Sequence, residues 1–284
     1  LAVVYANGSR IGFLYAWLTG IVFLAATVFW IKYSTWAGMV FAVIVLGGFF
    51  ALPFSIAAYV SRVRFIAGLA VFPFAVAAVE WIRSFDQLAF PWMILGNSQS
   101  MYPGLVQFAD ITSVFGVSAW VAAVNATAYY GIVRRRVHAV VLLAFMFLLP
   151  FLYSQWRMSR IPEGGAELTV ALIQGNVSPL EKWRDGLEEW NIRLYASMSA
   201  QATRYNPDLI VWPETAIPAY FADIPSYREM VQSEVDSLGI PVLTGTPSID
   251  FGTNRTWNSA ALVVPGGNEI ERYHKIHLVP FREA

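Results

Sequence analysis

Hydrophobic and polar residues are distributed very unevenly along this chain. Long apolar stretches follow one another up to residue 158, and charged residues become common only after Glu163. A run of ~20 apolar residues crosses a bilayer as a helix, and an open strand in lipid would leave backbone groups unpaired. Residues 1–158 are therefore predicted to form a transmembrane helix bundle. The five predicted spans are residues 11–31, 36–60, 65–82, 111–133 and 137–155.

The pattern changes after a linker at residues 160–165. Short apolar runs with β-forming residues now alternate with amphipathic stretches, which is typical of an α/β layered domain. We expect this domain to occupy residues 166–284, with a sheet that is unfinished at the last residue. The predicted strands are residues 168–174, 208–212, 240–246, 257–264 and 269–273, and the predicted helices are 187–205 and 226–238.

Composition supports a membrane protein. The chain of 284 residues is 57% hydrophobic and 13% charged, whereas soluble domains carry ~25% charged residues. A net charge of zero argues against a nucleic-acid partner. The absence of cysteine excludes disulfides and thiolate metal sites, and three scattered histidines argue against a histidine metal site. We expect neither a metal nor another cofactor.

Basic residues predict the orientation of the bundle. Arg10, Arg62 and Arg64, and the run at residues 134–136, fall on one side if the five spans alternate. Short loops rich in Lys and Arg remain in the cytoplasm. The loop at residues 84–110 and everything after the fifth span are therefore expected outside the cytoplasm, which places the α/β domain on the outer side of the membrane.

Two short blocks in the last third carry candidate chemistry. Glu214 follows a hydrophobic strand that ends at Pro213, and Lys275 also follows a strand, with Glu283 a few residues later. Each residue alone reads as a solvated side chain. Together they offer a base for a nucleophile and a cation for an oxyanion. The nucleophile itself is not present in a recognisable motif.

These blocks resemble the nitrilase, or carbon–nitrogen hydrolase, superfamily, whose triad is Glu, Lys and Cys. Across nearly its whole length the chain resembles the apolipoprotein N-acyltransferase family, in which a membrane helix bundle carries a nitrilase-like αββα sandwich. The matching blocks are Phe90-Pro91-Trp92 with Leu95-Gly96-Asn97-Ser98-Gln99, Ile173-Gln174-Gly175-Asn176 with Lys182-Trp183, Trp212-Pro213-Glu214, and Lys275 through Phe281.

The resemblance implies roles for individual residues. Glu214 corresponds to the general base, Lys275 to the triad lysine and Glu283 to a second essential carboxylate. Trp183 corresponds to a tryptophan near the lipid entrance. Trp92, in the apolar loop on the same side, either forms part of a lipid portal or rests on the membrane surface.

One departure from the family pattern is Arg282, where the family usually has Gly. Arg adopts positive φ poorly, which puts the placement of Glu283 in doubt. The first residue is Leu and no closing element follows the last block, so we interpret the chain as a fragment cut at both ends. The catalytic cysteine would then lie beyond Ala284, and the fragment itself is expected to be inactive.

The implied activity is a two-step acyl transfer in lipoprotein maturation. A phospholipid donates an acyl chain to the cysteine, and the amino group of a diacylglyceryl-cysteine apolipoprotein accepts it. The implied location is the bacterial inner membrane, with the catalytic domain in the periplasm. Two alternatives stay open: a membrane-anchored amidase that transfers its acyl group to water, and a non-catalytic membrane protein with a nitrilase-like binding domain.

Overall fold

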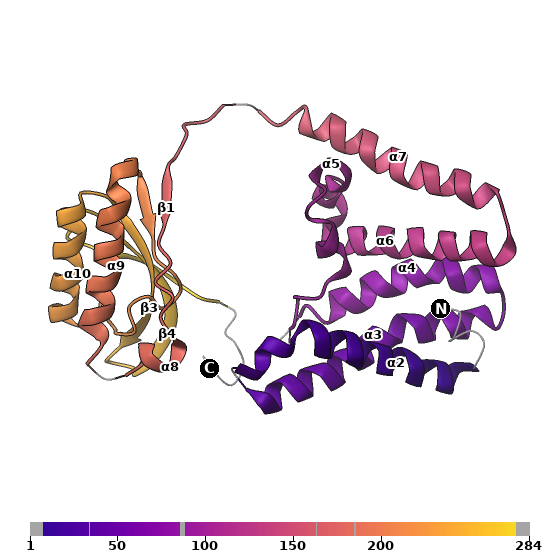
Figure 1. Cartoon of the computed structure of the whole chain (residues 1–284), viewed down its shortest axis with the longest axis horizontal. Coiled ribbons are helices and arrows are strands. Elements are labelled where there is room, and N and C mark those ends of the chain that lie inside the picture. Colours follow the sequence, from indigo (N-terminus) through magenta and orange to yellow (C-terminus); the bar gives the residue numbers. More distant parts are fainter. Residues whose placement is uncertain (1–7, 34, 86–88, 163, 185, 277–284) are drawn as a thin grey trace. The chain divides into compact units, whose positions relative to one another are not determined.

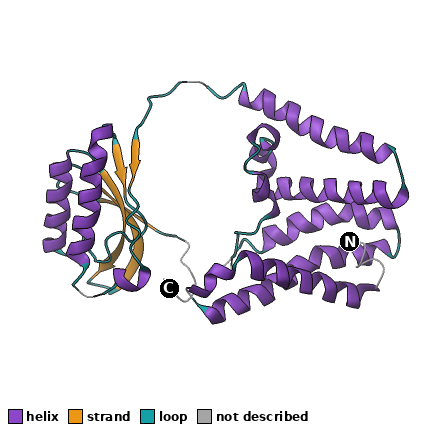
Figure 2. Cartoon of the chain, in the orientation of Figure 1, coloured by secondary structure: helices purple, strands orange, loops and turns teal. Residues whose placement is uncertain are grey.

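The computed structural model describes residues 8–33, 35–85, 89–162, 164–184 and 186–276. The chain divides into two compact units, residues 1–163 and residues 164–284 (Figure 1). We call them the helical unit and the sheet unit. Figure 2 shows that the described elements of the first are all helical, whereas the second combines helices and strands.

Apolar sequence without interruption by charge gives the helical unit its long helices. They are α2 (Gly8–Thr27), α3 (Trp36–Ser61), α4 (Phe65–Ile82), α6 (Ala109–Arg134) and α7 (His138–Met158), with the short elements η1 (Phe29–Tyr33), η2 (Leu95–Gln99) and α5 (Pro103–Val106). Each of the five predicted spans thus contains a long helix. The first is shorter than predicted, because η1 follows α2 and the hydroxyl of Thr35 then caps α3 by accepting from the Gly38 N–H.

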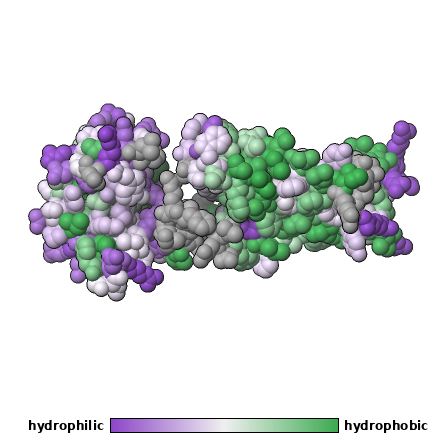
Figure 3. Space-filling model, turned by 90° about the horizontal axis from the view of Figure 1, so that it is seen from below, coloured by the Kyte–Doolittle hydropathy of each residue, from purple (hydrophilic) through white to green (hydrophobic). Residues whose placement is uncertain are grey.

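Four of these helices, α3, α4, α6 and α7, are long and apolar enough to cross a membrane, and residues Ile11–Thr27 of α2 form a shorter apolar helix. Large apolar side chains cover the outside of the helical unit, as the green surface in Figure 3 shows. An apolar surface of this extent is unfavourable in water and suits a lipid environment.

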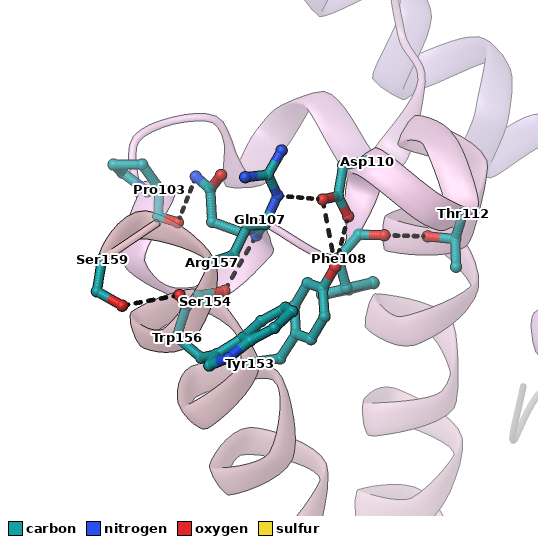
Figure 4. Close-up of polar contacts among 10 residues, drawn as sticks. All are labelled: Pro103, Gln107, Phe108, Asp110, Thr112, Tyr153, Ser154, Trp156, Arg157 and Ser159. Atoms are coloured by element: carbon teal, nitrogen blue, oxygen red, sulfur yellow. Dashed lines mark hydrogen bonds and ion pairs between the residues drawn. The ribbon is translucent and has the colours of Figure 1, made fainter. Parts of the chain in front are cut away.

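Polar contacts hold the start of α6 to the end of α7 (Figure 4). The Asp110 carboxylate accepts a hydrogen bond from the Tyr153 hydroxyl at 3.0 Å and one from Arg157 Nε at 2.7 Å. The Ser154 hydroxyl accepts from the Gln107 N–H at 3.0 Å. These contacts fix the separation of the two helices at this end of the unit.

The sheet unit is built on one five-stranded sheet in the order β1-β2-β3-β4-β5. The first three strands are parallel and the last two pairs are antiparallel. The strands are β1 (Val170–Leu172), β2 (Leu209–Val211), β3 (Val242–Asp250), β4 (Arg255–Val263) and β5 (Glu271–His274). All five lie where the sequence predicts strands.

Two helices, α9 (Glu188–Ala202) and α10 (Pro225–Leu238), cover one face of this sheet (Figure 1). The short elements α8 (Pro179–Lys182) and η3 (Thr203–Tyr205) flank α9. Ile192 of α9 and Val231 of α10 are fully buried against Ile210 and Val242 of the strands. Burial of one such side chain contributes ~1.5–3 kcal/mol. This shared core fixes the strand ends on which the candidate site is built.

Candidate active site

The turn that carries Glu214 is anchored on both sides by buried residues. Trp212 precedes it, is buried and donates from its indole Nε1 to the Ser199 hydroxyl at 2.8 Å. Ala216 and Ile217 follow it and are fully buried. Pro213 and Glu214 are the exposed residues between these anchors. The anchoring therefore presents one carboxylate at the end of a strand, where α/β proteins commonly place their sites.

The backbone of this turn is tight. Thr215 has a φ of +51°, a left-handed conformation that β-branched residues rarely adopt. Gly245 of β3 lies against the turn so closely that a Cβ at this position would be 2.6 Å from the Cα of Glu214 and 2.5 Å from the backbone N of Thr215. The absence of a side chain at Gly245 is thus what lets the Glu214 turn approach the sheet.

Strand register brings Lys275 to the same place. The Lys275 N–H donates to the Asn258 carbonyl at 2.8 Å, which continues the β4–β5 ladder by one residue beyond His274. The Lys275 ammonium is 3.3 Å from Oε1 of Glu214, and Nδ2 of Asn258 donates to the same oxygen at 2.6 Å. Side chains from β4 and from the end of β5 therefore converge on one oxygen of the carboxylate that follows β2.

Lys182 reaches the turn from another direction. Lys182 is the last residue of α8, and its ammonium donates to the backbone carbonyl of Glu214 at 3.0 Å. Burial lowers the pKa of the Lys182 ammonium, and the nearby charge of Glu214 partly opposes this effect. Lys182 thus fixes the main chain of the turn, whereas Lys275 and Asn258 contact its side chain.

The arrangement places an accessible carboxylate beside a cation. The side chain of Glu214 is 64% exposed and that of Lys275 is 34% exposed. Exposed ion pairs contribute little to stability because water screens them. Their value here is chemical: an accessible carboxylate can take a proton from a nucleophile, and the ammonium can stabilise a developing oxyanion.

A second polar pair, Ser259 of β4 and His274 of β5, lies on the face of the sheet opposite to Asn258 and Lys275. The Ser259 hydroxyl is 2.8 Å from Nδ1 of His274, and the Trp257 ring stacks on the imidazole at 4.8 Å. A serine beside a histidine is the start of a nucleophilic site. However, Ser259 is only 4% exposed, so a substrate has no access to its hydroxyl. We interpret the pair as structural.

The other residues singled out by the sequence are placed as follows. Trp183 follows Lys182 directly and is 58% exposed. Glu283 lies outside the described residues. Trp92 belongs to the helical unit, where its ring lies 4.8 Å from that of Trp30.

The loop of Trp92 is held by two side chains at the end of α4. Oε1 of Glu80 accepts from the Leu95 N–H at 2.8 Å, and the Arg83 guanidinium donates to the Met93 carbonyl at 2.6 Å. The backbone on the C-terminal side of Trp92 is therefore tied to the end of α4.

The sequence alone does not single out Asn258, and it assigns no role to Lys182. Asn258 sits within a strand, with no motif around it, and only the β4–β5 register aligns it with Lys275. Lys182 stands in a recognised block, but its partner is a backbone carbonyl 32 residues away. Because every residue has a backbone carbonyl, the sequence cannot indicate which carbonyl Lys182 contacts. Its position beside Trp183 in a family block is the feature of the sequence that points to Lys182.

Comparison with known proteins gives matches to two family models along the chain. The family model described as the apolipoprotein N-acyltransferase N-terminal domain matches residues 1–127, and the carbon–nitrogen hydrolase model matches residues 169–284. Among solved structures, a crystal structure of an N-terminal amidase aligns with a TM-score of 0.29 at 24% identity, covering 38% of this chain and 28% of that chain.

Relatives of known name cover nearly all of the chain. An apolipoprotein N-acyltransferase of Geobacter metallireducens is 35% identical over 96% of this chain and 56% of its own length. One of Chlorobaculum tepidum is 30% identical over 94% of this chain and 55% of its own length. The chain thus spans about half the length of these relatives. With both family models and these relatives in agreement, the chain belongs to the apolipoprotein N-acyltransferase family.

Proposed function

We propose that this chain carries the base and the cation of an acyltransferase that N-acylates apolipoproteins. Glu214 acts as the general base and Lys275 stabilises the oxyanion. The nucleophile is a cysteine thiol encoded after residue 284, and Glu283 is a second carboxylate of the same site. The observation that carries this proposal is the convergence of Lys275 and Asn258 on one oxygen of Glu214.

In the first step, Glu214 takes the thiol proton and the sulfur attacks the ester carbonyl of a phospholipid. The carbon–sulfur bond forms, and the negative charge on the carbonyl oxygen lies near the Lys275 ammonium. The ester carbon–oxygen bond then breaks, and the proton held by Glu214 passes to the leaving alcohol. The products are a lysophospholipid and a thioester acyl-enzyme.

In the second step, the amino group of a diacylglyceryl-cysteine apolipoprotein attacks the thioester. The carbon–nitrogen bond forms, the carbon–sulfur bond breaks, and the amine proton returns to the sulfur by way of Glu214. An amide replaces a thioester, so the step is strongly favourable. Because donor and acceptor use the same nucleophile in turn, the kinetics should be ping-pong.

Both substrates in this scheme are lipids, which gives the helical unit a role. An apolar bundle exposes its surface to acyl chains. We propose that Trp92 contacts lipid on the helical unit and that Trp183 contacts lipid on the sheet unit. The excess of arginine at the α3–α4 and α6–α7 turns supports a cytoplasmic location for that end. By this proposal the protein resides in the bacterial inner membrane, with the sheet unit in the periplasm.

Product identity tests the proposal against hydrolysis. The gene product that contains this chain is incubated with phospholipid vesicles and a synthetic diacylglyceryl-cysteine peptide, and the products are separated by liquid chromatography with mass spectrometry. The proposal predicts an N-acylated peptide and a lysophospholipid in equal amounts. Release of free fatty acid, with the peptide unchanged, would favour the membrane-anchored amidase instead.

A further inference from the structure

An apolar groove opens on the helical unit between α4, α6 and α7. Its volume is about 560 Å³, within the range of ~300–1,000 Å³ typical of ligand pockets. Small side chains of Ala70, Ala123 and Ala126 create the hollow, and Tyr130 and His138 border one end. The groove lies wholly within this unit and contains none of the residues assigned to acyl transfer.

The length of the groove matches one leaflet of a bilayer. On α6 its lining runs from Ala119 to Tyr130, which corresponds to roughly 16 Å of helix at ~1.5 Å per residue. The hydrocarbon core of a bilayer is ~30 Å thick. The groove therefore extends from the end of the bundle to about the middle of the membrane, which is the depth reached by one acyl chain.

Positive charge surrounds the end at which Tyr130 and His138 lie. Arg134 is the last residue of α6, Arg135 and Arg136 follow it, and all three are exposed. The Arg134 guanidinium lies 4.8 Å from the ring centroid of Phe65, so the α3–α4 turn, with its own arginines, is part of the same end. Hydrophilic side chains gather at the right-hand end of the helical unit in Figure 3, the end that Figure 1 shows to carry both turns.

Negative charge is distant from this end. In the part of the helical unit that the structure describes, the acidic residues are Glu80 and Asp110. Glu80 is near the C-terminal end of α4 and Asp110 near the start of α6. The arginine-bearing turns are at the other ends of these two helices. Among the described residues of this unit, a ligand at the Tyr130 end of the groove therefore meets cations and no nearby carboxylate.

We propose that the groove binds one molecule of an anionic glycerophospholipid in the leaflet at the arginine end. One acyl chain fills the groove, and the phosphate and the anionic headgroup lie against the arginines at residues 134–136. Basic pockets between transmembrane helices bind anionic headgroups in this manner. This lipid is a bound structural ligand, distinct from the acyl donor, and the inference does not depend on the proposed function.

Native mass spectrometry of the delipidated, detergent-solubilised protein can test this. The protein is titrated separately with phosphatidylglycerol and phosphatidylcholine of identical acyl chains. We expect one phosphatidylglycerol to bind about tenfold or more tightly than phosphatidylcholine, because the arginines attract an anionic headgroup. Replacing the three arginines together (R134Q, R135Q, R136Q) should remove this preference. Ala70→Trp should prevent binding of both lipids by filling the groove.

Matched variants distinguish a change in the groove from the general effect of losing a positive charge or adding an indole. Arg160→Gln removes a charge beyond the other end of α7, and Leu149→Trp adds an indole at an exposed position of α7 outside the groove. Both should bind phosphatidylglycerol as the unaltered protein does. Equal affinity for the two lipids, retained preference in the triple arginine variant, or unchanged binding in Ala70→Trp would each overturn the proposal.

Discussion

The ammonium of Lys275 lies 3.3 Å from the carboxylate of Glu214, although 61 residues separate them in the sequence. Two local features produce this contact. The buried Trp212 and Ala216 hold the Glu214 turn in place, and the Lys275–Asn258 backbone hydrogen bond fixes where the chain leaves β5. The pair is therefore preorganised by the sheet, which is what a site needs in order to stabilise charge that develops during a reaction.

Asn258 and Ser259 are neighbours on β4 whose side chains point to opposite faces, so they form a matched pair of variants. Asn258→Ala removes the hydrogen bond to Glu214 and should lower kcat/KM for acyl transfer roughly 10- to 100-fold, the usual effect of losing a hydrogen bond to a charged group. Ser259→Ala should leave acyl transfer unchanged. A larger loss of activity in Ser259→Ala than in Asn258→Ala would indicate that the active site lies on the other face of the sheet.

Asn258→Asp should change the pH dependence of the reaction. The new carboxylate would stand beside Oε1 of Glu214, and two adjacent carboxylates resist ionising together. The acidic limb of the kcat/KM profile should therefore move to higher pH, with activity partly recovered in alkaline buffer. A uniform loss of activity at all pH values would argue against Glu214 as the base.

Lys182 is a positioning residue, because it contacts the backbone of Glu214 rather than its carboxylate. Lys182→Met should lower kcat about tenfold while leaving KM nearly unchanged, since small misplacements of a catalytic group reduce the rate of chemistry. Lys182→Arg, which keeps a donor, should restore most of the rate. A change confined to KM, or no rescue by Arg, would assign Lys182 a different role.

Gly245→Ala tests the close approach of β3 to the Glu214 turn. The added Cβ would meet backbone atoms at 2.5 and 2.6 Å, so the turn must move. A displacement of ~1 Å is expected to cost about 100-fold in kcat. Gly165→Ala, at a position with open space around it, serves as the control and should retain full activity. Retention of full activity in Gly245→Ala would show that the turn tolerates this displacement.

The hydrogen bonds of Asp236 predict that the thermal stability of the fold depends on pH. The Gly266 N–H and the Gln232 amide donate to its carboxylate and hold the pKa of Asp236 below its usual value. A carboxylate whose pKa is lower in the folded than in the unfolded chain stabilises the fold at pH values above its unfolded pKa of about 3.9. This stabilisation is lost as the pH falls through the pKa of the folded state. Asp236→Asn should therefore lower the thermal midpoint at pH 7, with the difference shrinking below about pH 4.

Circular dichroism melts of the chain in detergent, with Glu234→Gln as the control, would measure this effect. A difference between Asp236→Asn and the unaltered chain that stays constant from neutral to acidic pH would contradict the assignment, as would the same behaviour in Glu234→Gln.

Much of the fold was predictable because long apolar runs and short β-forming runs leave a strong local signal. The full extent of β3 could not be predicted from the sequence. The predicted strand ended at residue 246, before Pro247, which has no N–H to donate. In the structure β3 continues to Asp250, since its antiparallel pairing with β4 extends past the proline.

The candidate site was predictable only in part. Glu214 and Lys275 belong to recognisable blocks at strand ends, and the structure brings them together. The contribution of Asn258 depends on strand register, and that of Gly245 on the approach of one backbone to another. Such long-range relationships arise from the packed sheet and have no local sequence signature.

Direct detection of the acyl-enzyme tests the central claim, that Glu214 and Lys275 together activate a thiol for acyl transfer. The gene product that contains this chain is incubated with phospholipid vesicles without acceptor, and its intact mass is measured. The account predicts a mass increase of one acyl group that hydroxylamine removes, and no increase for Glu214→Gln over the same time. Absence of the adduct in the unaltered protein, or equally rapid formation in Glu214→Gln, would contradict it.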